Sequence, residues 1–98
     1  MAKDRKYEVM FILNPDLEKE EKDDLIERIS GNITDNNGVI DEKDEWGTRE
    51  LAYEINDYKT GYYTVINFTG NSEVINELEY DFSILDNILR YLIVRKDN

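Results

Sequence analysis

The chain has 98 residues, of which 40% are hydrophobic and 36% are charged, and its formal net charge is -11. A chain of this length forms one domain with one modest core, which we assign to residues 1–98. The absence of histidine and cysteine excludes disulfides, thiolate nucleophiles, imidazole bases and the common structural zinc sites. The acidic charge, taken alone, argues against a polyanionic partner such as nucleic acid.

The distribution of apolar residues argues against a membrane protein and against disorder. No apolar run approaches the roughly 20 residues that span a bilayer. Residues 1–6 (MAKDRK) lack the apolar segment of a signal peptide. The apolar residues recur in short periodic runs, so we expect a folded, soluble, cytoplasmic protein.

The first part of the chain has the pattern of a strand followed by a helix. Residues 7–13 (YEVMFIL) are β-branched, aromatic and almost continuously apolar, which predicts a central strand. Asn14 and Pro15 end that strand, and because proline suits a helix's first turn we predict that a helix begins there. Asn37 and Gly38 favour the left-handed conformation that closes helices, so this helix should end near Asn37. Its apolar stripe consists of Leu25, Ile26, Ile29 and Ile33.

The middle of the chain has the pattern of a hairpin. Residues 39–55 form a long strand with half-exposed alternation near its end, and Gly47 favours a bulge within it. Residues 57–61 (DYKTG) have turn chemistry, and residues 62–68 (YYTVINF) are again β-branched and aromatic. We therefore predict two paired strands joined by a turn at residues 57–61.

The last part of the chain adds a helix and a strand. Residues 70–72 (GNS) are turn and cap residues, and residues 88–94 (ILRYLIV) are a second β-type run. The intervening helix has its apolar residues at helical spacing: Val74, Ile75, Leu78 and Phe82. The order βαββαβ predicts an α+β, ferredoxin-like sandwich. Its four-stranded antiparallel sheet has the order 4-1-3-2, with two helices on one face and the other face open.

The acidic residues concentrate in residues 16–27, on the first predicted helix. A metal or paired-carboxylate site is one reading, but helical periodicity spreads these groups over the solvent side, which favours a solvated face. Residues 35–38 fail the ligand spacing of a calcium loop, because Val39 stands where a ligand is needed. We therefore predict no metal ligands, no catalytic residues and no cofactor.

Half of the twelve basic residues lie near the two ends of the chain: Lys3, Arg5, Lys6, Arg90, Arg95 and Lys96. The predicted strand order places residues 95–96 beside residues 5–6, which gives a local positive edge. We expect Arg49 and Lys59 to project toward the same end of the sheet. Two readings of this edge stay open: solubilising charge that blunts an edge strand, and a phosphate-binding side on an otherwise acidic protein.

The aromatic residues also allow two readings. Phe11, Tyr62 and Tyr63 occupy strand positions that stack on bases in RNA-recognition motifs. Residues 10–14 and 61–62 loosely resemble the two signatures of that family, but residues 64–68 do not continue the second one. Core or cross-strand packing is the alternative.

Residues 46–55 (WGTRELAYEI) resemble the central signature of the bacterial ribosomal protein S6 family, roughly G-x-R-x-L-A-Y-x-I. The resemblance extends over nearly the whole chain through four further short matches: Tyr7-Glu8, Asn14-Pro15, Gly61-Tyr62, and Asp86-Asn87 with Arg90. It implies a ferredoxin-like structural constituent of the 30S ribosomal subunit without catalytic activity. It also implies binding to the central domain of 16S ribosomal RNA jointly with ribosomal protein S18, in support of platform assembly and translation in the cytoplasm.

The resemblance also implies which residues meet the partners. Phosphate contacts are expected at Arg5, Lys6, Arg49, Arg90 and Arg95, and Lys96 joins them as part of the same predicted edge. For the protein partner we predict contact with Trp46, Tyr53 and Ile55, because an exposed aromatic edge suits strand or peptide docking; the alternative for Tyr53 is plain sheet packing.

This chain departs from its apparent relatives at three positions in the same region. Glu50 and Asn56 replace residues that are often basic, and Glu54 replaces a common proline. These changes and the net charge of -11 predict weak RNA binding by the isolated chain and cooperative binding with ribosomal protein S18.

Two other functions share this topology. An acylphosphatase-like enzyme needs glycines and an arginine in the loop after the first strand, but residues 14–17 (NPDL) have neither, and Asp16 would repel a phosphate. An independent RNA-recognition module or an oligomerising domain is the second alternative. Binding of single-stranded RNA by the lone protein would distinguish that module from the ribosomal assignment.

Overall fold

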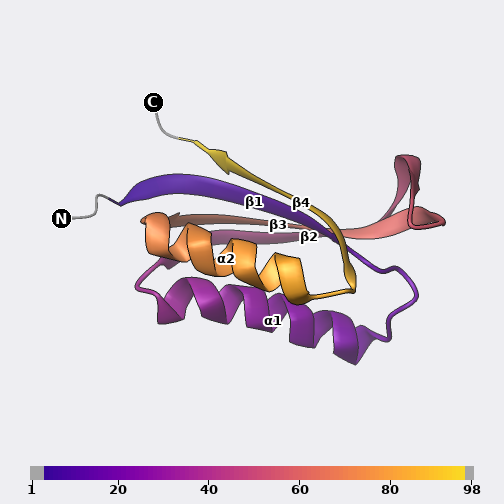
Figure 1. Cartoon of the computed structure of the whole chain (residues 1–98), viewed down its shortest axis with the longest axis horizontal. Coiled ribbons are helices and arrows are strands. Elements are labelled where there is room, and N and C mark those ends of the chain that lie inside the picture. The colour runs from indigo at the N-terminus through magenta and orange to yellow at the C-terminus, as the bar shows by residue number, and fades with distance from the viewer. Residues whose placement is uncertain (1–3, 97–98) are drawn as a thin grey trace.

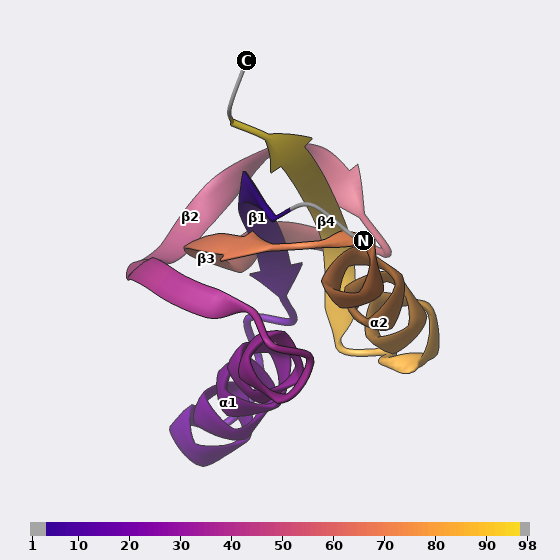
Figure 2. The same ribbon diagram turned by 90° about the vertical axis from the view of Figure 1, so that its left-hand side faces the viewer.

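The computed structural model describes residues 4–96 and shows two helices packed on one face of a four-stranded antiparallel sheet (Figures 1 and 2). The elements are β1 (Arg5–Leu13), α1 (Lys19–Asp35), β2 (Val39–Ile55), β3 (Tyr58–Gly70), α2 (Ser72–Ile84) and β4 (Ile88–Arg95). The sheet order is β2-β3-β1-β4, which confirms the predicted α+β, ferredoxin-like topology. Neither helix within this described part is long and apolar enough to cross a membrane.

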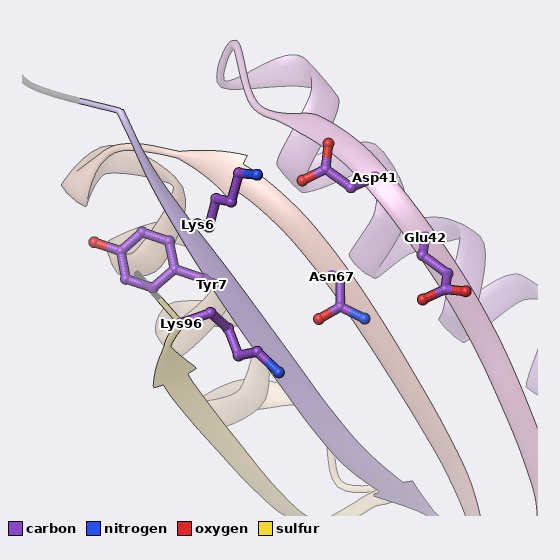
Figure 3. Close-up of a pocket in the computed structure, with 6 residues that line it drawn as sticks. All are labelled: Lys6, Tyr7, Asp41, Glu42, Asn67 and Lys96. Carbon is purple, nitrogen blue, oxygen red and sulfur yellow. The ribbon is translucent and has the colours of Figure 1, made fainter. Parts of the chain in front are cut away.

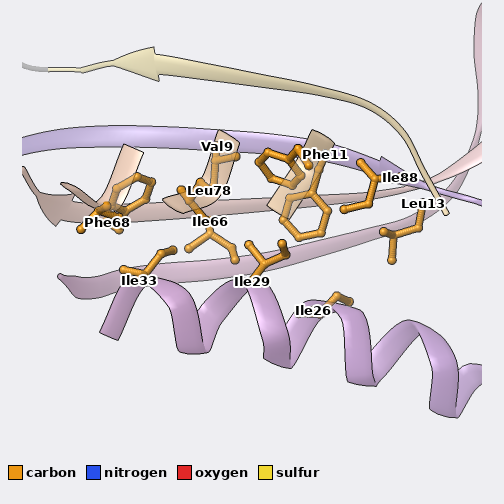
Figure 4. Close-up of a cluster of buried hydrophobic side chains, with 12 residues drawn as sticks. Val9, Phe11, Leu13, Ile26, Ile29, Ile33, Ile66, Phe68, Leu78 and Ile88 are labelled. Atoms are coloured by element: carbon orange, nitrogen blue, oxygen red, sulfur yellow. The ribbon is translucent and has the colours of Figure 1, made fainter. Parts of the chain in front are cut away.

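The core lies between the helices and alternate residues of the central strands (Figure 4). Val9, Phe11 and Leu13 of β1 are fully buried there, as strand periodicity requires. The helix stripes predicted from the sequence meet them: Ile26, Ile29 and Ile33 from α1, and Val74, Leu78 and Phe82 from α2. Burial of one such side chain contributes about 1.5–3 kcal/mol, so each of these residues stabilises the packing of the helices on the sheet.

Helix α1 begins at Lys19 rather than near Pro15, so the predicted start was wrong by about one turn. Glu18 and Glu21 form a capping box, in which the Glu18 backbone N–H donates to Glu21 Oε1 at 3.3 Å. Upstream, Asn14 Oδ1 accepts from the backbone N–H of Asp16 at 2.9 Å. This local turn holds Pro15 outside the helix.

The end of α1 confirms the prediction near Asn37. The helix stops at Asp35, and Asn37 has a left-handed φ of 68°. The Gly38 N–H then donates to the Ile33 carbonyl at 2.8 Å, which is the hydrogen bond of a Schellman cap. A Cβ on residue 38 would lie 2.7 Å from that carbonyl oxygen, so the cap requires glycine.

The hairpin turn is shorter and earlier than the predicted turn at residues 57–61. Asn56 and Asp57 form the turn, with φ values of 50° and 69°, and β3 already begins at Tyr58. Two left-handed residues match the right-handed twist of the flanking strands, so Asn-Asp closes the hairpin without the glycine at residue 61. The predicted bulge at Gly47 is confirmed by its φ of 85° and by a register shift beside it.

The end of β2 departs from regular pairing. Glu50 pairs with Thr60 and Ile55 pairs with Tyr58, so residues 51–54 all lie opposite Lys59. We call residues 51–57 the hairpin tip. Figure 1 shows that it turns away from the helices at the end of the sheet opposite to the two termini.

Helix α2 begins as predicted, with Asn71 Oδ1 accepting from the backbone N–H of Glu73 at 2.9 Å. Asp81 is buried between the helices with 3% of its surface exposed. Its carboxylate accepts from Arg28 at 3.1 Å and also from Asn32. This contact ties α1 to α2 and fixes the layer that covers the core.

Candidate nucleic-acid and partner interface

Four of the six predicted RNA-contacting residues form one cluster, which we call the basic corner: Arg5, Lys6, Arg95 and Lys96. Arg95 lies opposite Tyr7 in the β1–β4 ladder, and the Lys96 N–H donates to the Lys6 carbonyl at 2.8 Å. The predicted adjacency of the two ends of the chain is therefore confirmed. Basic groups that are 90 residues apart in sequence share one corner of the sheet.

Acidic side chains border the basic corner (Figure 3). Lys96 Nζ lies 3.6 Å from Glu8 Oε2, and Lys6 shares a shallow hollow with Asp41 and Glu42 of β2. Asp41 also accepts from Thr69 Oγ1 at 2.8 Å, which holds its carboxylate in place. The basic corner therefore combines neighbouring carboxylates with lysine and arginine side chains that reach solvent.

Arg49 and Lys59 lie at the other end of the sheet, so the prediction that they join this edge was wrong. Arg5 lies opposite Gly70 in the β1–β3 ladder, whereas Arg49 lies opposite Gly61 in the β2–β3 ladder. Since β1 and β2 are both antiparallel to β3, they run in the same direction. A residue late in β2 therefore lies where β1 ends, far from the start of β1.

Arg90 also lies at the hairpin end of the sheet, opposite Ile12 of β1. Its Nη1 donates to the Tyr53 hydroxyl, and its guanidinium carbon lies 5.2 Å from the centre of the Tyr53 ring. Arg49, in contrast, donates from Nε to the Trp46 carbonyl at 3.3 Å. The six predicted residues thus occupy the basic corner and two separate positions near the hairpin.

The three predicted partner-contacting residues lie on the open face. Trp46 and Tyr53 are 44% and 58% exposed, and Tyr53 and Ile55 line one hollow together with Tyr63. The Trp46 ring stacks on the Tyr63 ring, with centroids 6.1 Å apart and an interplanar angle of 10°. Tyr63 therefore joins the three predicted residues into one surface.

Further apolar residues of the open face were missed from the sequence. Leu92 and Val94 of β4 are 54% and 40% exposed, and Met10 lies opposite Leu92 in the ladder. They alternate with core residues along β1 and β4, so strand periodicity could have found them. The apolar open face, as we use the term, consists of Met10, Trp46, Tyr53, Ile55, Tyr63, Leu92 and Val94.

The structure contradicts base stacking on Phe11. This side chain is fully buried and packs against Phe82 with ring centroids 5.8 Å apart. Tyr62 lies at the helix-side edge of the sheet, where its hydroxyl donates to Glu45 at 2.8 Å and the Lys22 ammonium lies 4.9 Å from its ring centre. The hydrogen bond to Glu45, with partial burial, raises the pKa of Tyr62 to about 12.

The acidic side of the molecule is a solvated helix face with ion pairs. Lys19 Nζ lies 2.9 Å from Asp23 and Lys43 Nζ lies 3.8 Å from Glu27; the hydrogen bond to Asp23 raises the pKa of Lys19. Among residues 4–96 no three acidic side chains approach closely enough to hold a metal ion.

Three comparisons relate the chain to known proteins. The sequence model of the family described as Ribosomal protein S6 matches residues 6–95. Small ribosomal subunit protein bS6 of Thermoanaerobacter pseudethanolicus is 50% identical over 93 residues, which cover 95% of this chain and 98% of the relative. The protein of the same name from Desulforudis audaxviator is also 50% identical, with 95% and 99% covered. The crystal structure of 30S ribosomal protein S6 from Thermotoga maritima superposes with a TM-score of 0.91 at 37% identity, covering 96% of this chain and 89% of that one.

Proposed function

The chain belongs to the ribosomal protein S6 family, and from that premise we propose that RNA phosphates at the basic corner and a protein partner on the apolar open face hold it in the ribosome. It is a protein of the small ribosomal subunit with a structural role, and it acts in the cytoplasm, where the ribosome is. The RNA is the central domain of 16S ribosomal RNA and the partner is ribosomal protein S18. Together they support assembly of the platform.

The observation that carries the RNA proposal is the convergence of both ends of the chain on the basic corner. An acidic protein can bind RNA where a few lysine and arginine side chains meet phosphates locally. The net charge of -11 still opposes the approach of RNA to the molecule as a whole. We therefore expect weak binding by the chain alone.

The apolar open face supports the second part of the proposal. Exposed aromatic and aliphatic side chains that share one surface are typical of protein contacts. Trp46 and Leu92 are 44% and 54% exposed and come from the two edge strands of the sheet. A partner with a basic surface would bury these side chains and offset the charge that repels RNA.

An electrophoretic shift assay on a central-domain RNA fragment tests both parts. We expect a weak complex with this chain alone and a much tighter complex when ribosomal protein S18 is added. The variant Lys6→Glu should weaken the ternary complex and reduce the slope of log K against log salt by at least about 0.7–0.9.

The matched control for Lys6→Glu is Lys19→Glu, which makes the same charge change on the acidic helix. It should have a small effect on affinity and none on the slope. Equal effects of the two variants would show that total charge, and not the basic corner, governs binding.

For the partner contact, Leu92→Ser should weaken binding of ribosomal protein S18 in the absence of RNA. Ile84→Ser, which removes a similarly exposed apolar side chain from α2, is the control and should leave that binding unchanged. If both variants bind S18 as the original chain does, the open face is not the partner surface.

A further inference from the structure

We propose that Tyr53 is a positioning residue for Arg90, which it holds over the open face so that the guanidinium is ready to take up an RNA phosphodiester. This inference rests on the proposed function, because it assigns Arg90 to phosphate. It gives Tyr53 a task different from direct contact with a protein partner.

The tie between Tyr53 and Arg90 depends on the irregular end of β2. Strands β2 and β4 are the two outer strands of the sheet, separated by β3 and β1, so regular pairing would keep their side chains apart. The extra residues of β2 between Glu50 and Ile55 let the hairpin tip reach across the open face. Tyr53 thereby meets Arg90, 37 residues away in sequence, and both line one hollow with Met10 and Ile12.

The contact leaves Arg90 free to bind an anion. The Tyr53 hydroxyl accepts one N–H of the guanidinium, which has five donors in all. The tyrosine ring is attracted to the cation without neutralising it. The remaining donors can form the paired hydrogen bonds that guanidinium makes with phosphate oxygens.

Arg90 differs in its partner from Arg28 and Lys96, which both pair with carboxylates. Arg28 pairs with Asp81, and Lys96 pairs with Glu8, so an incoming phosphate would have to compete with a carboxylate at those sites. Within residues 4–96, Arg90 forms no salt bridge, and its side-chain partner is the uncharged Tyr53. A long side chain that is ordered by a neutral group retains its charge and loses less conformational entropy on binding.

The first experiment examines the tie in the free protein. Nitrogen relaxation at Arg90 Nε should show an ordered side chain in the original protein, a more mobile one in Tyr53→Phe and the most mobile one in Tyr53→Leu. Tyr63→Phe removes a neighbouring hydroxyl of the same hollow and should leave Arg90 unchanged. Equal order at Arg90 in all four proteins would overturn the proposal.

The second experiment measures the complex with RNA and ribosomal protein S18. Arg90→Gln should reduce affinity and lower the log-log salt slope by about 0.7–0.9. Tyr53→Leu should reduce affinity by about 2- to 12-fold, the range expected for one freed side chain, but leave the slope unchanged because Arg90 still meets its phosphate. Tyr53→Phe should have a smaller effect in the same direction.

The double variant separates positioning from direct contact. If Tyr53 acts through Arg90, adding Tyr53→Leu to Arg90→Gln should cause no further loss. A full additional loss would show that Tyr53 acts independently of Arg90 and would overturn the proposal. If Arg90 is ordered by Tyr53 but Arg90→Gln leaves affinity and slope unchanged, the assignment of Arg90 to phosphate fails, and the inference fails with it, while the test with Lys6→Glu at the basic corner is unaffected.

Discussion

The two faces of the sheet are built from the same strands and differ in what covers them. On the helix side, Phe11 and Phe68 are fully buried. On the open side, Ile12 and Val65 are only 4% and 5% exposed, although neither helix covers them. Leu92, on that same side, is 54% exposed. The open face therefore has a covered part near the centre and a bare part along β4.

This difference separates the residues that fold the chain from those that are available to partners. Apolar side chains under the helices stabilise the domain through burial. The open-face side chains of β4, Leu92 and Val94, are 54% and 40% exposed and gain less of this stabilisation in the free protein. A small exposed apolar surface of this kind is common on soluble proteins. Strand periodicity places the two sets one residue apart, so neighbouring substitutions should report on different properties.

The largest expected effect comes from a pair of neighbours on β1. Phe11→Ala should lower the free energy of unfolding by about 3–5 kcal/mol, because it opens a cavity in a fully buried site. Met10→Ala, on the partly covered open face, should lower it by about 1 kcal/mol or less. Urea unfolding with a constant m value measures both. Comparable losses for the two variants would mean that the open face stabilises the fold as much as the helix side does.

The buried residues of the helix side could be predicted from the sequence because they follow the hydrophobic periodicity of strands and helices. Alternation along β1 and helical spacing along α1 and α2 placed the apolar residues that pack in the core. The start of α1 was wrong because a local turn around Asn14 and a glutamate cap at Glu18 replaced the common signal at Pro15. Cap chemistry depends on hydrogen bonds that composition alone does not reveal.

The open face was less predictable, for two reasons. The predicted topology was right, and the strand directions that it implies place Arg49 and Lys59 at the hairpin end of the sheet. The prediction assigned them to the opposite end, beside Arg5 and Lys6. The tie between Tyr53 and Arg90 could not be predicted, because the alternation of residues 51–55 indicates a regular strand. Only the shifted register reveals that the hairpin tip folds over the sheet.

An intermediate effect should come from the covered part of the open face. A Cβ at residue 61 would lie 2.2 Å from Ile12 Cγ2 and 3.4 Å from Leu51 Cδ2, so Gly61→Ala should cost about 1–3 kcal/mol through overpacking. Gly31→Ala is the control. Nothing lies within 4 Å of a Cβ there, and alanine in a helix should add up to about 1 kcal/mol. If Gly61→Ala leaves the free energy of unfolding unchanged, the hairpin tip can shift to accept the added Cβ. The covered part of the open face would then not be tightly packed.

The smallest expected effect on the free energy of unfolding comes from a hydrogen bond at the edge of the helix side, which Tyr62 donates to Glu45. The pKa of Tyr62 is raised to about 12, above the value near 10 of an unfolded chain, because only the neutral hydroxyl can donate to a carboxylate. The stabilisation from this contact is therefore complete below about pH 10 and is lost as the pH rises toward 12. Solvent at this partly exposed site keeps it small.

The difference in unfolding free energy between the original protein and Tyr62→Phe isolates that contact, since all other residues are the same in both. The difference should be largest near neutral pH and should shrink across the alkaline range. Tyr80→Phe, which removes the hydroxyl of a tyrosine that is 61% exposed, is the matched control. A difference for Tyr62→Phe that stays constant with pH would mean that the ring's packing under Lys22, and not the hydrogen bond to Glu45, stabilises this rim. Packing, and not hydrogen bonding, would then stabilise the helix side even at its edge. The helix side would differ from the open face in this respect more than the hydrogen bond of Tyr62 suggests.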